Sequence, residues 1–216
     1  MGADEHMNGQ SRTTSGRVVV WALAGALTLG ATLSGCGERA RDLSQLTGED
    51  RRGEALVISR DAERLAAMGK TDDAILRYQE ALSISGDLAG AWNNLGELYM
   101  RRGSYADAVS AFGVAAGLTP SDPRPVYNTG LVYQKVGWAK DAIDHYAEAL
   151  KRDENMQEAL RGHAVAADML GRADDKTLEY IRRGLLRETD PEWREFFERQ
   201  RFRVEAEMRA LTRRGG

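Results

Sequence analysis

Hydrophobic residues recur at intervals of three and four along residues 55–190, which is the spacing of an α-helix with one buried face. Residues 89–122 show this most clearly, with one stripe of Trp92, Leu95 and Tyr99 and a second of Ala108, Phe112 and Ala115. Runs in which Val, Ile and Thr alternate with polar residues do not occur in this sequence, so we expect no strands. The pattern predicts an all-α protein built from paired helices.

The stripes repeat every 34 residues, and four kinds of residue keep this spacing. Each glycine is expected to end a first helix in the left-handed conformation, and each aspartate to lie in the first turn of a second helix. The small residues would let the two helices approach closely, beside the aromatic ones. The four columns are Gly69, Gly103, Gly137 and Gly171; Asp73, Asp107, Asp141 and Asp175; Tyr78, Phe112, Tyr146 and Tyr180; and Ala62, Gly96, Gly130 and Ala164.

A repeated 34-residue helix–turn–helix unit with these residues resembles the tetratricopeptide repeat (TPR). One hairpin cannot bury its apolar face alone, so the repeats are expected to stack into a right-handed solenoid of about four antiparallel hairpins over residues 55–190. The repeats are residues 55–88, 89–122, 123–156 and a degenerate 157–190, in which Lys176 and Arg183 replace alanines.

The C-terminal residues 191–216 are expected to form a helix that caps the last hairpin. Asp190 followed by Pro191 is a typical helix start. An apolar stripe follows, consisting of Trp193, Phe196, Phe197, Val204, Met208 and Leu211. The alternative is an amphipathic helix that binds a membrane surface or a partner.

The N-terminal residues 1–35 are typical of a secretory leader, because Arg12 and Arg17 precede an apolar run. The run ends in Leu33-Ser34-Gly35-Cys36, which resembles the lipobox of bacterial lipoproteins. The resemblance implies a diacylglyceryl group on the Cys36 thiol and cleavage just before it. The alternative is an uncleaved membrane anchor, since the uncharged stretch 18–37 is long enough to span a bilayer.

Residues 36–54 are expected to form a tether between the lipid and the repeats, unless Thr47-x-x-Asp50 caps an earlier helix. Gly37 after the cysteine implies, by the same resemblance, the outer membrane of a bacterium with two membranes. In a bacterium with one membrane, the location would be the outer face of the plasma membrane.

Composition adds little chemistry to this picture. The net charge of −3 gives no sign of nucleic-acid binding, and one cysteine allows no internal disulfide. His145 and His163 stand alone, without the neighbours of a metal site, and no phosphate-binding loop follows a strand. We therefore expect no cofactor, no metal and no enzymatic activity.

In TPR proteins the first helices line a concave groove, and the resemblance transfers that role to residues here. A peptide or helix of an exported or envelope protein is the expected ligand. Ser59 and Glu63 stand where chaperone-binding TPRs place the Lys and Asn of a carboxylate clamp, so an acidic chain end is not expected to bind. The candidate groove residues are Asn93, Asn94, Glu97, Arg101, Arg124, Tyr127, Asn128, Leu131 and Arg161.

The sequence as a whole indicates a lipid-anchored adaptor of the cell envelope. Its layout is similar to that of pilotins and of the TPR lipoproteins that assemble Flp-type pili, which implies a role in pilus or secretion assembly. Two alternatives stay open: a scaffold that recruits cell-wall hydrolases or proteases, and a structural protein that associates with itself.

Overall fold

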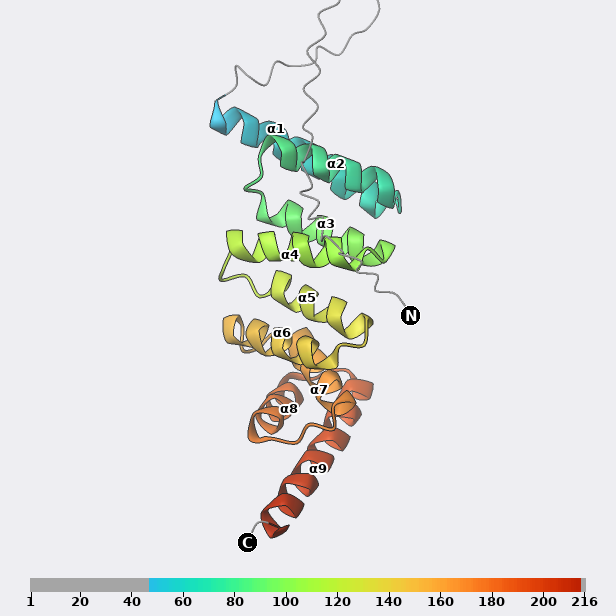
Figure 1. Ribbon diagram of the computed structural model, residues 1–216, viewed down its shortest axis with the longest axis vertical. Helices are drawn as coiled ribbons and strands as arrows, with labels where there is room; N and C mark the ends of the chain where they lie inside the picture. The colour runs from blue at the N-terminus through green and yellow to red at the C-terminus, as the bar shows by residue number, and fades with distance from the viewer. Residues whose placement is uncertain (1–46, 215–216) are drawn as a thin grey trace, which may run out of the picture. The chain divides into compact units, whose positions relative to one another are not determined.

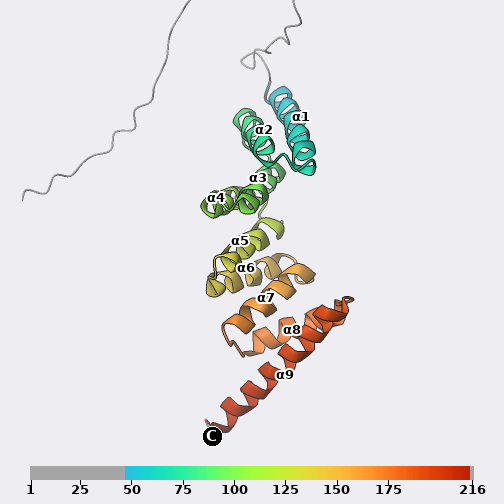
Figure 2. The same ribbon diagram turned by 90° about the vertical axis from the view of Figure 1, so that its right-hand side faces the viewer.

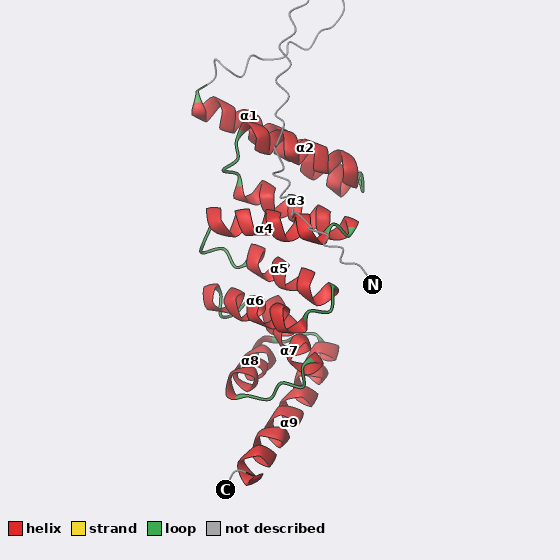
Figure 3. Ribbon diagram, in the orientation of Figure 1, coloured by secondary structure: helices red, strands yellow, loops and turns green. Residues whose placement is uncertain are grey.

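The computed structural model describes residues 47–214, and within that range all regular structure is helical (Figures 1 and 3). The predicted leader, the predicted lipidation site Cys36 and residues 36–46 of the predicted tether lie outside the described residues. No helix in the described range combines the length and apolar character needed to cross a membrane. The helices are α1 (Gly48–Ala67), α2 (Thr71–Ile84), α3 (Ala89–Arg102), α4 (Tyr105–Leu118), α5 (Arg124–Lys135), α6 (Ala139–Arg152), α7 (Gln157–Met169), α8 (Asp175–Arg187) and α9 (Pro191–Arg214).

The helices of residues 47–214 stack in chain order. Each helix packs mainly against its neighbours in the chain. The first helices of successive hairpins also touch, α1 with α3, α3 with α5 and α5 with α7, and α7 touches α9. Figure 2 shows that the direction of the helix axes changes from one hairpin to the next. The predicted all-α solenoid of stacked hairpins is therefore confirmed.

The glycine column ends the first helices as expected. Gly69, Gly103, Gly137 and Gly171 have φ angles of 76°, 84°, 81° and 58°. These values lie in the left-handed region, which a residue with a Cβ enters only at a cost. The chain can thus turn back sharply into the second helix of each hairpin.

The column of small residues brings the two helices of a hairpin together. A Cβ on Gly96 would lie 2.6 Å from Cε1 of Phe112, and one on Gly130 would lie 2.8 Å from Cε1 of Tyr146. The aromatic rings thus fill the space that the missing side chains leave. Tyr146 also packs against Gly162 of the next repeat, so one ring joins two hairpins.

The fourth repeat departs from the register. The residue 34 positions after Ala139 is 173, but α8 begins at Asp175, whose predecessor Asp174 caps the helix through its side chain. Lys176 is exposed where the other repeats bury an alanine, and Thr177 is fully buried instead. In the degenerate hairpin α8 is therefore rotated about its own axis by about one residue, so that Thr177 takes the buried position of Lys176.

The first helix begins earlier than the tether prediction allowed. Thr47 and Asp50 form a capping box, in which the Thr47 side chain accepts from the Asp50 backbone N–H and the Asp50 side chain accepts from the Thr47 backbone N–H. Residues 48–54 are therefore helical rather than tether, because the cap satisfies backbone groups at the helix start.

Helix α9 covers the end of the stack. The Asp190 side chain accepts hydrogen bonds from the backbone N–H groups of Glu192 (2.9 Å) and Trp193 (3.4 Å), as expected for a cap before Pro191. Phe197 and Val204 of the predicted stripe are fully buried in the core that α8 also lines. Leu211, at the far end of the stripe, is exposed.

Candidate partner-binding surface

The surface formed by α1, α3, α5 and α7, the first-helix face, carries the candidate residues. Residues four apart on a helix lie on one side of it, as Asn93 and Glu97 do on α3 and Tyr127 and Leu131 do on α5. Because these helices touch in series, side chains from successive repeats become neighbours on this face.

Two hollows lie along the seam between α1 and α3 and share Glu63. The smaller, of 220 Å³, is lined by Glu63, Asn94, Glu97 and Arg101, together with Tyr78. The larger, of 420 Å³, includes Ser59 and Glu63. The structure thus brings three predicted site residues, Asn94, Glu97 and Arg101, into one cavity.

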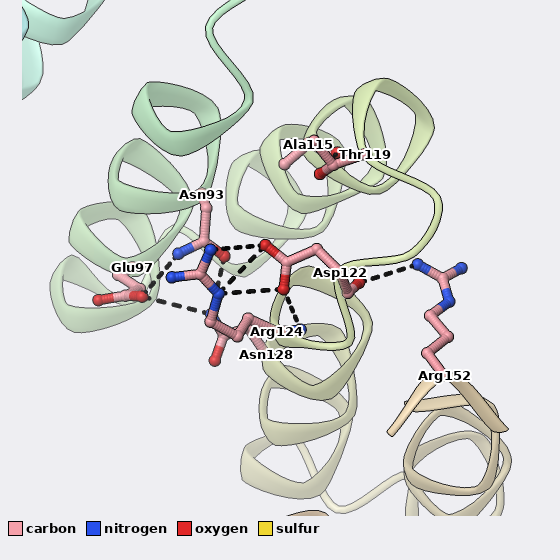
Figure 4. Close-up of polar contacts among 8 residues, drawn as sticks. All are labelled: Asn93, Glu97, Ala115, Thr119, Asp122, Arg124, Asn128 and Arg152. Carbon is pink, nitrogen blue, oxygen red and sulfur yellow. Dashed lines mark hydrogen bonds and ion pairs between the residues drawn. The ribbon is translucent and has the colours of Figure 1, made fainter. Parts of the chain in front are cut away.

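Amide groups hold the carboxylate of Glu97 between α3 and α5 (Figure 4). Asn93 Nδ2 donates to Glu97 Oε1 over 2.8 Å, and Asn128 Nδ2 donates to the same oxygen over 3.3 Å. Asn128 also donates to Asn93 Oδ1 at 3.0 Å, and both asparagines are buried. These two candidate groove residues therefore orient a carboxylate within the fold.

Arg124 begins α5 and pairs with Asp122 just before it. Its Nη2 lies 2.7 Å from Asp122 Oδ2, and Asp122 Oδ1 also accepts from the Arg124 backbone N–H. The hydrogen bond from the Arg124 side chain is the main reason why the pKa of Asp122 is lowered. Arg152 at the end of α6 donates to the Asp122 backbone oxygen (Figure 4), so the loop between α4 and α5 is held by both helices of the third hairpin.

An apolar area occupies the middle of the first-helix face. Tyr127 and Leu131 are partly buried and pack against the core of α6 and α7. The rings of Tyr127 and Tyr146 have centroids 5.7 Å apart in a tilted arrangement. Burial raises the pKa of the Tyr127 hydroxyl, so this group stays neutral at physiological pH.

Arg161 is engaged within the fold. Its Nη2 and Nε donate to the two carboxylate oxygens of Glu188 over 2.6 and 2.8 Å. Its guanidinium also lies 5.0 Å from the ring centroid of Trp193 on α9. The side chain that we predicted as a groove ligand therefore fastens the capping helix to α7.

The sequence reasoning missed Tyr78, which lines the smaller hollow although it belongs to a second helix. Its hydroxyl accepts a hydrogen bond from Asn94 Nδ2 over 3.1 Å. Burial raises the pKa of this hydroxyl to about 12. The aromatic column could have indicated this position. A ring that packs against the small residue Ala62 can extend past the first helix, so that its hydroxyl reaches the first-helix face.

Both histidines of the repeats lie inside aromatic packing. His163 is buried, with its ring 4.7 Å from that of Tyr180, and His145 stacks on Tyr133 at 5.1 Å. Burial lowers the pKa of His163 to about 4 and that of His145 as well. Among residues 47–214, no group of three or more His, Cys, Asp or Glu side chains is arranged to hold a metal ion.

Two family models match the part of the chain that carries these features. One, described as a TPR repeat, covers residues 62–103, and the other, described as a tetratricopeptide repeat, covers residues 91–125. Residues 62–125 therefore match tetratricopeptide repeats. Together the two matches run from the end of α1 to the start of α5.

Relatives among characterised proteins share the TPR stretch. Superkiller complex protein 3 of Homo sapiens is 29% identical over 123 residues, which is 54% of this chain and 8% of the human protein. Superkiller protein 3 of Schizosaccharomyces pombe is 36% identical over 77 residues, which is 36% of this chain and 6% of that protein. The chain thus spans less than a tenth of the length of these relatives.

Solved structures of other proteins share the fold. A crystal structure of MamA superposes with a TM-score of 0.56 at 20% identity, over 68% of this chain and 79% of MamA. The first TPR of Spaghetti, bound to an HSP90 peptide, superposes with a TM-score of 0.54 at 22% identity, over 56% of this chain and 95% of that one.

Proposed function

We propose that this protein is a lipid-anchored adaptor of the cell envelope that holds a segment of a partner protein on its first-helix face. The face combines hydrogen-bonding groups and carboxylates at α1 and α3 with the apolar area at Tyr127 and Leu131. An extended peptide or an amphipathic helix needs both kinds of contact. The Spaghetti TPR, a structure of the same fold, holds an HSP90 peptide, which supports this kind of ligand.

The single observation that carries the proposal is the hollow seam between α1 and α3, continued by Tyr127 and Leu131 on α5. Cavities of 220 and 420 Å³ have room for side chains of a bound segment. Inside the second hairpin, by contrast, the ring of Phe112 fills the space beside Gly96.

Site-specific photocrosslinking in the native cell tests this function. Benzoylphenylalanine would replace Leu131 on the first-helix face or, as a matched control, Leu76 on α2, which is 63% exposed. We expect light-dependent adducts with one defined protein from position 131 and none of that mass from position 76. Equal adducts from both positions, or none from position 131, would contradict the proposal. An adduct of two copies of this chain would assign the face to self-association.

The envelope location rests on the leader and on the lipobox ending at Cys36, and the pilus or secretion role rests on the layout alone. We propose that the lipid holds the repeats at the membrane so that they meet exported proteins. The identity of the protein crosslinked at position 131 also tests the pilus or secretion role. A pilus or secretion component would support that role, whereas a cell-wall hydrolase or protease would favour the alternative of a scaffold for these enzymes.

A further inference from the structure

The 220 Å³ hollow between α1 and α3 has an unbalanced set of charges. Two carboxylates, Glu63 and Glu97, line it together with one basic side chain, Arg101. Neither carboxylate forms an ion pair with any residue in the range 47–214. The lining of the hollow therefore has one more carboxylate than it has basic side chains, and Arg124 on α5 is a further cation that interacts with Glu97.

The position of Glu97 is fixed before any ligand arrives. The amides of Asn93 and Asn128 hold its Oε1, and these two asparagines are buried. Amide donors orient a carboxylate without cancelling its charge, so Glu97 stays an acceptor for a cation. Holding the group in place in advance lowers the entropy lost on binding.

The remaining polar lining also suits a donor-rich side chain. Asn94 donates to the Tyr78 hydroxyl oxygen, and burial keeps that hydroxyl protonated by raising its pKa to about 12. The negative charges of Glu63 and Glu97 also raise this pKa, which shows that both carboxylates act on the same small space. Arg101 is exposed and can turn toward solvent when a second cation enters.

We propose that this hollow receives a lysine or arginine side chain of the segment held on the first-helix face. The inference rests on the proposed function and names the charge that the partner must carry there. An acidic segment such as SRMEEVD, the HSP90 peptide in the Spaghetti structure, would meet like charge at Glu63 and Glu97. The apolar area at Tyr127 and Leu131 would then take a hydrophobic residue of the same segment.

A positional-scanning library of decapeptides, captured on the full chain in detergent, measures this preference. Each position is fixed in turn as Lys, Arg, Gln, Glu or Leu. We expect Lys and Arg to be enriched over Glu by about tenfold at one position, and the enrichment to shrink as salt is added. The peptide SRMEEVD is included as a separate probe and is expected not to bind.

Three variants separate the hollow from the rest of the surface. Glu63→Gln is expected to reduce the basic preference about threefold to fivefold, and the double variant with Glu97→Gln to abolish it. Glu198→Gln, on the exposed side of α9, is the matched control and should leave the preference unchanged. Thermal unfolding of each variant identifies any loss of fold, and the conclusion is drawn from Glu63→Gln if the double variant unfolds.

The outcomes distinguish this inference from the function on which it rests. Peptides that bind without any basic preference, or a preference that survives in both folded variants, would overturn the basic-residue pocket and leave the adaptor function standing. Tighter binding of SRMEEVD than of basic peptides would also overturn the basic-residue pocket and leave the adaptor function standing. Failure of every peptide to bind would overturn both.

Discussion

At the scale of single residues, small side chains decide how closely the helices of a hairpin approach. A glycine in a helix normally costs about 1 kcal/mol relative to alanine, yet Gly96 lies in the middle of α3. The ring of Phe112 explains this, because it takes the place of the missing Cβ. The position is therefore one where a poor helix former stabilises the protein through packing.

Replacing Gly96 with leucine is expected to lower the free energy of unfolding by about 1–3 kcal/mol or more, because the new side chain would overlap Phe112. Gly113→Ala is the matched control, since nothing lies within 4 Å of a Cβ at that position in α4. It should stabilise the protein by about 0.5–1 kcal/mol through helix propensity. Urea unfolding measures both. Equal stability of Gly96→Leu and wild type would contradict the proposed role of the crossing.

His163 makes stability depend on pH. Burial is the main reason why its pKa is lowered to about 4; Arg172 and Lys176 lower it further, and Asp174 opposes them. Between pH 6.5 and 4 the unfolded chain binds a proton on this residue and the folded chain does not, so stability falls as the pH falls. The pKa difference corresponds to a loss of about 2 kcal/mol between pH 7 and pH 5.

His163→Leu is expected to flatten this pH profile, because leucine occupies the same place of the repeat in the second hairpin, at Leu95. Chemical unfolding at pH 7, 6 and 5 gives the measurement. A small slope should remain, since burial also lowers the pKa of His145. A variant whose stability still falls by about 2 kcal/mol over this range would contradict the assignment to His163.

At the scale of helices, one buried carboxylate helps to hold α9, in addition to the packing of Phe197 and Val204. The side chain of Glu188 is only 1% exposed and accepts two hydrogen bonds from Arg161 and one from Gln157. The hydrogen bonds from Arg161 are the main reason why its pKa is lowered to about 2. This stabilisation is complete above pH 4.5 and is lost as the pH falls toward 2, because the carboxylate must then be protonated.

Glu188→Gln is expected to cost about 2 kcal/mol, because it leaves the Arg161 guanidinium without its charged partner. Amide hydrogen exchange should show the loss mainly in α9 and α8 and little in α1 and α2, since each repeat contacts only its neighbours. Glu195→Gln removes an exposed ion pair with Arg199 and is the matched control, expected to change stability by less than about 0.5 kcal/mol. A uniform loss of protection across the repeats would contradict the local role of Glu188.

The helices and turns could be predicted because each depends on a local rule. Gly103 can adopt the positive φ that the end of a first helix requires, and Pro191 is favoured in the first turn of a helix. The rotation of α8 by about one residue could not be predicted, because it depends on the length of the loop before Asp174. The role of Arg161 was hidden for a similar reason, since its partner Glu188 lies 27 residues away and outside the groove. Tyr78 was missed because its helix belongs to the other side of the hairpin.

At the scale of the whole molecule, the two ends of the helical stack are closed by local structure, and the first-helix face lies between them. Helix α9 closes one end with Phe197, whose ring takes the place of a Cβ on Gly184, just as Phe112 does on Gly96. The opposite end begins with the capping box at Thr47, inside the segment predicted as a tether. The first-helix face between them carries the hollows of 220 and 420 Å³ and the apolar area at Tyr127 and Leu131.

The proposed lipid anchor is tested independently of the repeats by Cys36→Ala, because the proposed diacylglyceryl chain would be attached to the Cys36 thiol. Two or three acyl chains bind a membrane stably, at about 0.8 kcal/mol per buried CH₂, and the variant should lose them all. We expect it to leave the membrane fraction or to keep its leader, whereas Ser34→Ala, which preserves a small residue before the cysteine, should be processed as wild type. The measurements are detergent-phase partitioning, the mass of the mature chain and labelling with an alkyne fatty acid. A processed Cys36→Ala protein that still entered the detergent phase would mean that another segment holds the chain at the membrane.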